Sequence, residues 1–283
     1  MLKIGVLCPF HAPHGFRLIA DQLLNYSSFL QHSECTFVMH PSLQTPREGL
    51  YEKLAIFCSN KHSLIITPES VPTSQHSTID AICSLTESIS SGAASELDVI
   101  YYHTDSDFLF RTDAEKLMTA FDYAVYADPA RLGQSDWMWK EKMLSNRLIN
   151  DFMARIGITQ DELFSGGIEC SFYPVSLWLE IIGTIKSLKL PSGLIFDAIE
   201  DHWPAEEILI PTLAKAYASK LNLTSYGKSL CFRVTHGFGD EFVSIKNLQE
   251  LLAEDAFYAA KRISPDEKDP VRWMLSEFIR RLD

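Results

Sequence analysis

Apolar and polar positions alternate along the first 130 residues in the pattern of short buried strands separated by helices. Short apolar runs closed by proline or polar turn residues predict strands, and apolar residues spaced by three and four predict helices. The predicted strands cover residues 3–10, 35–40, 63–67 and 98–103. The predicted helices cover residues 16–31 and 78–89, and residues 51–58 fit a short helix or a strand. This alternation favours an α/β fold with a mostly parallel central sheet flanked by helices.

The second half of the chain is less regular, but it contains no internal repeat and no low-complexity linker. Apolar spacing predicts helices at residues 114–123, 140–156, 174–188 and 205–221, and a strand at residues 230–235. Gly157 is placed to end the second of these helices, and Pro174 to begin the third. We therefore expect one continuous domain over residues 1–283.

The last segment, residues 270–282, has apolar residues at helical spacing with three arginines between them. This pattern predicts an amphipathic C-terminal helix. Such a helix either docks on the domain or makes a basic, peripheral contact with a membrane surface or another subunit.

Composition narrows the range of partners and compartments. The net charge of −12 argues against a nucleic-acid partner, because phosphate backbones require clustered Lys and Arg, although a single nucleotide needs only a local cationic site. The six cysteines are scattered without a CxxC pair, which predicts reduced, packed thiols. No apolar run reaches the ~20 residues of a membrane span, and the chain begins with a strand rather than a signal peptide. These features predict a cytoplasmic protein, with any membrane contact at the inner face.

The most informative motif is Asp105-Ser106-Asp107, which lies directly after the strand predicted at residues 98–103. On a strand, residues i and i+2 point to the same side, so the two carboxylates would converge at its end. Convergent carboxylates need a positive partner, and a hard divalent cation, Mn²⁺ or Mg²⁺, is the simplest one. Such a cation also binds substrate phosphates. The Asp-x-Asp pattern also occurs in solvated turns. The prediction of a metal site therefore depends on the position of the motif after a series of predicted strands.

With this motif in this place, the chain resembles the A-type (GT-A) nucleotide-sugar glycosyltransferases. The resemblance implies a nucleotide-sugar-binding half at residues 1–130, with a UDP-sugar as the expected donor, and a half at residues 131–283 that binds a glycan or glycolipid acceptor in polysaccharide biosynthesis. It also implies that Asp105 and Asp107 hold Mn²⁺ or Mg²⁺ against the diphosphate. In several such enzymes a histidine on a strand or loop late in the sequence completes the metal site. His236 lies at the corresponding place in this sequence, although it also fits a plain loop residue.

The segment Pro204-Ala205-Glu206-Glu207 is similar to the Pro-Asp-Glu run around the base of the branching β-1,6-N-acetylglucosaminyltransferases. By that match Glu207 is the catalytic base that takes the proton of an acceptor hydroxyl, and Glu206 is its acidic neighbour. Those enzymes lack a working metal motif, which is a departure from the Asp-x-Asp pattern. Glutamates at a helix start are also favoured by the helix dipole, so simple capping is the alternative. The motif leaves open whether transfer inverts or retains the sugar configuration.

Two further segments complete the predicted donor site. By the resemblance, Gly166 and Gly167 line the donor sugar, where a missing Cβ lets the backbone approach a ligand, although a plain turn fits as well. Pro9, Phe10 and His11 occupy the place where such folds bind the base and ribose. The candidate cations for the diphosphate are Arg111, Lys140 and Lys142.

Three other functions fit parts of the pattern. An aspartate-nucleophile phosphohydrolase also places Asp-x-Asp after a strand, but it requires Thr or Val where Leu109 stands. A sugar nucleotidyltransferase normally has a glycine- and lysine-rich loop after its first strand, and residues 8–15 contain no lysine. A nucleotide-sugar-binding or scaffold protein would keep the fold and lose turnover. The joint presence of the aspartate pair, Glu207 and His236 favours an active hexosyltransferase.

Overall fold

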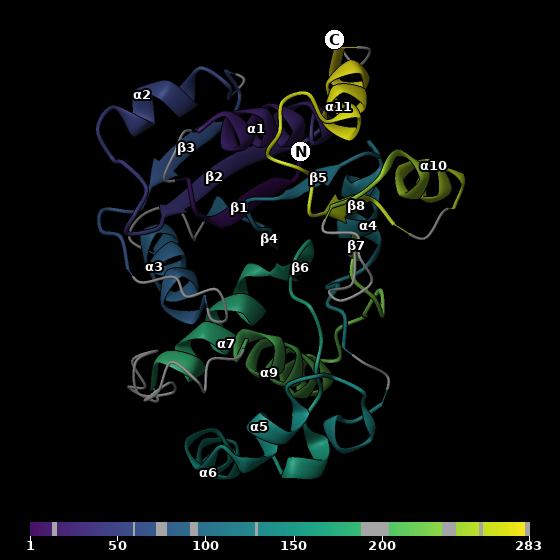
Figure 1. The fold of residues 1–283 in the computed structure, drawn as a ribbon. Coiled ribbons are helices and arrows are strands. Elements are labelled where there is room, and N and C mark those ends of the chain that lie inside the picture. Colours follow the sequence, from purple (N-terminus) through teal and green to yellow (C-terminus); the bar gives the residue numbers. More distant parts are fainter. Residues whose placement is uncertain are drawn as a thin grey trace.

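The computed structural model describes residues 1–12, 16–58, 60–71, 78–90, 96–127, 130–187, 204–233, 242–254 and 257–280. Its centre is a five-stranded sheet with the order β3-β2-β1-β4-β6 (Figure 1). The strands are β1 (Lys3–Phe10), β2 (Glu34–Pro41), β3 (Ser63–Ile66), β4 (Val99–Tyr102) and β6 (Ser171–Pro174). The first four are parallel, and β6 pairs antiparallel with β4. The α/β fold with a mostly parallel sheet, predicted from the sequence, is confirmed.

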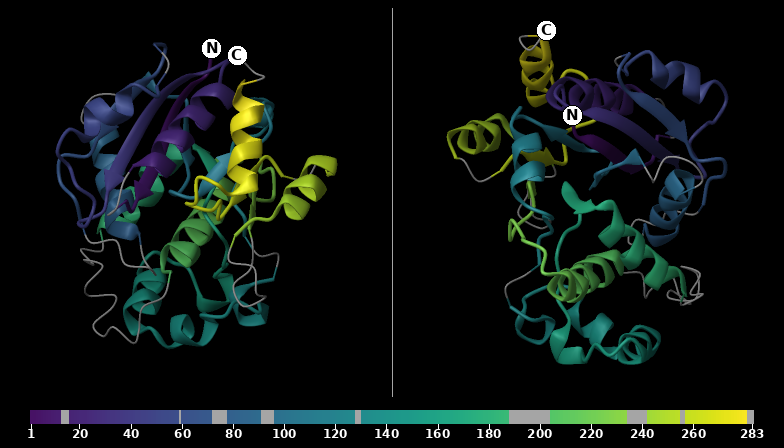
Figure 2. Two further views of the ribbon diagram at one scale, coloured as in Figure 1. Left: turned by 45° about the horizontal axis from the view of Figure 1, so that its top comes forward. Right: turned by 180° about the vertical axis from the view of Figure 1, so that it is seen from behind.

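Helices cover both faces of this sheet (Figure 2). One face carries α1 (Arg17–Phe29) and α2 (Leu50–Ala55). The other carries α3 (Ile79–Ser90) and α7 (Val175–Ser187), and α9 (Glu206–Leu221) packs against α7. Because successive strand residues point to opposite faces, Val6 belongs to the core under α1, whereas Leu7 belongs to the core under α3.

A second, three-stranded sheet lies beside the first one and has the order β5-β8-β7. Its strands are β5 (Asp107–Leu109), β8 (Ala259–Lys261) and β7 (Cys231–Arg233). After β5 the chain forms α4 (Ala114–Ala120), while α10 (Ile245–Ala253) and α11 (Pro270–Arg280) share an apolar core with β5 and β8. This small sheet joins three segments that are far apart in the sequence.

The predicted helix at residues 140–156 is two helices, α5 (Lys140–Ser145) and α6 (Arg147–Arg155). The break falls at Asn146, whose side chain accepts a hydrogen bond from the backbone N–H of Ile149 at 3.1 Å. An asparagine in this role satisfies a free N–H of the first turn and starts a new helix. Gly157, with a φ of 78°, follows α6 as predicted.

Three strands and one α-helix, β5, β6, β8 and α10, are not predicted from the sequence, and Pro174 ends β6 instead of beginning the helix. The three strands have only three or four residues, which is too short for a clear alternation of apolar and polar positions. They become strands because segments that are distant in the sequence pair with them in the folded chain.

The C-terminal helix α11 packs against α1 and α10. Val271, Leu275 and Ile279 are buried, and the Arg272 guanidinium forms an ion pair with Asp21 of α1. The apolar face of α11 is therefore covered by the domain. Within the described ranges, no helix has both the length and the apolar character needed to cross a membrane.

Candidate functional site

The candidate site lies where the loops after β1, β2 and β4 meet, at the carboxyl ends of the parallel strands. The chain runs outward from β1 to β2 and β3, and then returns to β4 on the other side of β1. Such a reversal opens a crevice at the strand ends, which is where open α/β sheets bind ligands. Here the backbone N–H of His11 donates to Asp105 Oδ2 at 2.9 Å, and His11 Nδ1 lies 2.8 Å from Ser42 Oγ.

The aspartate pair does not lie on one strand, which corrects the geometry expected from the sequence. β4 ends at Tyr102, Asp105 lies in the turn that follows, and Asp107 is the first residue of β5 in the second sheet. Short polar residues between the strands favour a turn, because their side chains bond to nearby backbone groups. The Asp107 carboxylate closes this turn by accepting from the backbone N–H of Thr104 at 2.9 Å.

Asp107 is fully buried, and its carboxylate is used to hold the structure together. Its Oδ1 accepts from Gln22 Nε2 at 3.1 Å and Tyr26 OH at 3.3 Å, and it lies 3.2 Å from His103 Nδ1. Its Oδ2 accepts from both the backbone N–H and the hydroxyl of Thr104, at 2.9 and 3.3 Å. With five groups around two oxygens, Asp107 ties α1 to the turn between the two sheets.

Asp105 has a different environment. Its Oδ2 accepts from His11, whereas its Oδ1 makes no hydrogen bond within the described residues. Burial raises the pKa of Asp105, and the His11 N–H and the charge of Lys261 oppose that rise. A single carboxylate suits a Mg²⁺ or Mn²⁺ that takes its other ligands from substrate phosphates and water. Of the two aspartates, Asp105 therefore fits a metal-binding role and Asp107 does not.

The third predicted ligand, His236, lies outside the described residues. Across the ranges that the structure describes, no three His, Cys, Asp or Glu side chains form a group that could hold a metal ion.

Two cationic side chains that the sequence analysis does not predict lie next to Asp107 in the second sheet. The strand register pairs Asp107 with Lys261, and Lys261 with Arg233, so the three side chains share one face. The side chains of Lys261 and Arg233 are 21 % and 32 % exposed. Burial and the neighbouring Arg233 lower the pKa of Lys261, and burial lowers the pKa of Arg233 to about 10. Arg233 therefore remains a cation at neutral pH.

Glu169 and Glu207 complete an ion-pair cluster with these two cations. The Oε1 and Oε2 atoms of Glu169 form ion pairs with Lys261 and Arg233 respectively. Arg233 Nη1 also lies 3.5 Å from Glu207 Oε1. The ion-pair cluster, defined as Glu169, Glu207, Arg233 and Lys261, thus joins the start of α9 to β7 and β8.

Glu207, the predicted base, is a partly buried member of the ion-pair cluster. The indole Nε1 of Trp137 donates to its Oε2 at 3.0 Å, and its side chain is 20 % exposed. Burial raises the pKa of Glu207, and the Trp137 hydrogen bond and the charge of Lys261 oppose the rise. A carboxylate held in this way is suited to accept a proton from a substrate hydroxyl.

Both glycines are closely packed, Gly166 against backbone and Gly167 against a side chain, and the groups that approach them belong to the protein. A Cβ atom on Gly166 would overlap the Tyr126 carbonyl, and one on Gly167 would overlap the Arg233 guanidinium. The N–H of Gly166 also donates to the carbonyl of Glu207 at 2.8 Å. The glycines therefore let Arg233 lie against the backbone beside the predicted base.

Glu206 does not share the site with Glu207, which corrects its expected role. It is 8 % exposed and bonds to Thr78, close to Tyr102, on the side of the core. Successive helical residues differ by about 100° in direction, so two neighbours cannot both face the ion-pair cluster. Burial raises the pKa of Glu206 to about 8, and its Oε2 has no hydrogen-bond partner within the described residues.

The free energy of unfolding is expected to fall as the pH rises from about 4.5 to about 8, because the folded chain holds the Glu206 proton more tightly than the unfolded chain. Below this window the carboxyl is protonated in both states, and above it the carboxylate is ionised in both. Glu206→Gln removes this component. Between pH 5 and pH 8 the wild type should therefore lose roughly 3 kcal/mol more unfolding free energy than the variant does. Denaturant unfolding at both pH values measures the difference. Equal pH dependence in the two proteins would show that Glu206 titrates normally.

Pro9 and Phe10 belong to β1 and are buried, so Phe10 packs in the core and does not present its ring at the strand ends. This corrects its expected role in stacking on a base. The apolar strand continues to its last residue because α1 covers this face. His11, the next residue, is exposed and contacts Asp105 in the site.

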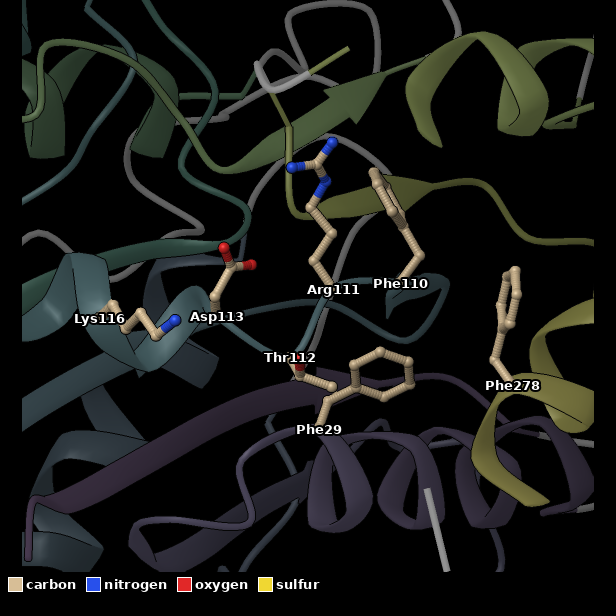
Figure 3. A pocket seen from close by; sticks show the side chains of 7 residues that line it. All are labelled: Phe29, Phe110, Arg111, Thr112, Asp113, Lys116 and Phe278. Carbon is tan, nitrogen blue, oxygen red and sulfur yellow. The ribbon is translucent and has the colours of Figure 1, made fainter. Parts of the chain in front are cut away.

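None of the three cations predicted from the sequence is a member of the ion-pair cluster. Arg111 lies over the Tyr258 ring, and Lys140 and Lys142 belong to α5. Arg111 also lines a cavity of about 400 Å³ formed by the end of α1, the start of α4 and α11 (Figure 3). Its other lining residues are Phe29, Phe110, Thr112, Asp113, Lys116 and Phe278. This cavity is separate from the candidate site.

Comparison of the chain with protein-family models and with curated protein sequences gives no significant match. The fold and the site are therefore the basis for inferring function. The site contains two cations, Lys261 and Arg233, that could bind an anionic oxygen group, and one carboxylate, Glu207, that could accept a proton. These residues lie near the strand ends, where open α/β sheets bind ligands.

Proposed function

We propose that this protein is a glycosyltransferase that moves a hexose from a nucleoside-diphosphate sugar, with UDP-sugars as the first candidates, to a hydroxyl of a glycan or glycolipid acceptor. The observation that carries the proposal is the position of Glu207 beside Lys261 and Arg233 at the strand ends. Two partly exposed cations suit a diphosphate leaving group, and the carboxylate suits a proton acceptor. A GT-A fold is part of the proposal, supported by four parallel strands with an antiparallel strand beside β4.

In the proposed reaction, the acceptor hydroxyl oxygen attacks the anomeric carbon and forms a new C–O bond, while the bond from that carbon to the diphosphate oxygen breaks. Glu207 takes the hydroxyl proton, and the electron pair of the broken bond stays on the diphosphate. Lys261 and Arg233 stabilise the negative charge that develops there. This assignment gives inversion of configuration. A retaining enzyme would use the same two cations without a base at Glu207.

Asp105 is the residue that would hold a Mn²⁺ or Mg²⁺ accompanying the donor. The bound cation would supply further neutralisation of the diphosphate charge. His11 fixes one oxygen of Asp105, and Asp107 holds the turn on which Asp105 lies.

Glu207→Gln is expected to lower kcat at least ~100-fold, because the amide keeps the shape of the side chain and cannot accept the proton. Binding of nucleoside diphosphate should stay close to that of the wild type, since the cations remain. A thermal-shift panel of nucleoside diphosphates with and without Mn²⁺, followed by transfer assays with the matching sugar donor, measures both quantities.

The matched control is Glu250→Gln, an exposed residue of α10 outside the site, which should leave both quantities unchanged. The absence of a shift with every nucleoside diphosphate, with and without Mn²⁺, would contradict the proposal. Binding without transfer by the wild type would instead indicate a nucleotide-sugar-binding protein.

A further inference from the structure

Glu169 is the most buried member of the ion-pair cluster. Its side chain is 9 % exposed, compared with 20 % for Glu207, 21 % for Lys261 and 32 % for Arg233. It lies between β6 and the glycine pair, Gly166 and Gly167, for which the resemblance implies a place beside the donor sugar. Its position behind both cations needs an explanation.

We infer that Glu169 is a positioning residue for a diphosphate group: it is the shared counter-ion that holds the Lys261 ammonium and the Arg233 guanidinium side by side. This inference rests on the proposed function, because it assumes that the two cations bind the donor diphosphate. It assigns Glu169 no contact with the reacting atoms. Glu169 acts through the two cations.

The strand register supplies the first reason for a shared counter-ion. Lys261 and Arg233 are register partners on neighbouring strands, and like charges in such positions repel one another. Each oxygen of Glu169 is paired with one of them, so one carboxylate compensates both charges. Removing one partner of a buried ion pair is strongly unfavourable, because it leaves the other charge uncompensated.

The number of donors supplies the second reason. An ammonium has three N–H donors and a guanidinium has five, so neither cation is saturated by its bond to Glu169. The backbone of Glu169 is fixed, because Ser229 Oγ donates to its carbonyl at 2.9 Å. Gly167 leaves room for the Arg233 guanidinium. The cations are therefore ordered before a phosphate arrives, which reduces the entropy lost on binding.

The test measures the affinity of inorganic pyrophosphate and of UDP by calorimetry in a chelating buffer, which removes the contribution of divalent metal. Glu169→Gln is expected to weaken binding of both at least tenfold, and Glu169→Asp is expected to restore part of the loss. The melting temperature of each variant is measured in parallel, and Glu250→Gln serves as the control with the same chemical change on an exposed helix. Glu169→Asp keeps the charge and provides the comparison if the glutamine variant does not fold.

The double variant Glu169→Gln/Lys261→Met separates a positioning role from a purely structural one. If Glu169 acts through Lys261 and Arg233, its replacement should change affinity less in the Lys261→Met background, where one of the two cations is already absent, than in the wild type. Equal or tighter pyrophosphate binding by Glu169→Gln would overturn the inference, since Glu169 would then compete with the phosphates, and would leave the proposed function standing. Failure of the wild type to bind both pyrophosphate and UDP, even with Mn²⁺ added, would overturn the proposed function as well.

Discussion

Lys261→Met is expected to lower kcat/KM for sugar transfer by about 100- to 1,000-fold, the usual effect of removing one preorganised donor from a developing negative charge. Methionine keeps the apolar stem and most of the volume of lysine, so the packing of β8 should persist. Glu169 still pairs with Arg233 in this variant, which leaves no unpaired carboxylate behind. We therefore expect a folded protein that binds the diphosphate more weakly. It should also stabilise less of the negative charge that develops on the diphosphate as its bond to the sugar breaks.

The measurement is a transfer assay with the donor identified by the thermal-shift panel, together with UDP affinity by calorimetry. Lys246→Met is the matched control, because Lys246 is exposed on α10 and pairs only loosely with Glu250, at 3.9 Å. Transfer by Lys261→Met within threefold of the wild type would show that Lys261 does not act on the leaving group.

Asp107→Asn is expected to lower the free energy of unfolding by about 3 kcal/mol, whereas Asp105→Asn should cost less than ~1 kcal/mol. Both oxygens of Asp107 accept hydrogen bonds, so either orientation of an amide places an NH₂ group against donors. Within the described residues Asp105 accepts one hydrogen bond, from the His11 N–H, and an asparagine oxygen can replace that acceptor. In a chain of this size the first change should lower the melting temperature by roughly 6–12 °C.

The two variants also separate the two roles that the Asp-x-Asp motif could have. Any effect of Mn²⁺ on nucleoside-diphosphate binding should disappear in Asp105→Asn, in a protein of nearly normal stability. Thermal unfolding and calorimetry with Mn²⁺ and UDP measure both properties. An Asp107→Asn variant with normal stability and no response to Mn²⁺ would restore Asp107 as the metal ligand that the sequence pattern implies.

For the Asp-x-Asp motif, the local sequence pattern predicted the position along the chain but not the geometry of the two carboxylates. Its predicted place, after a buried parallel strand, is correct. Its geometry is not, since the strand ends at Tyr102 and the second aspartate begins a strand of another sheet. The reason lies in α1, where the buried side chains of Gln22 and Asn25 bond to the turn and to β5. Nothing in the local sequence at residues 103–107 indicates these partners.

The glutamate pair gives the same lesson at a helix start. The match to a known run predicts that Glu207 is the base, and in the structure Glu207 lies 3.5 Å from Arg233. It also assigned a role to Glu206, which faces Thr78 in the core. Neighbouring residues in a helix point in different directions, so adjacency in the sequence does not imply a shared site.

By itself, the sequence determined the parallel strand series, most of the helices and the edge of the sheet where polar residues gather. These features depend on apolar spacing and turn residues, which act over a few positions of the chain. Only the tertiary structure decided which charges meet. Asp107, Arg233 and Lys261 come from three distant segments, and their short strands pair because the surrounding helices and the first sheet bring them together. Strand register between distant segments depends on the packing of the whole chain, so no local pattern could have identified Lys261, Arg233 and Glu169 as one cluster.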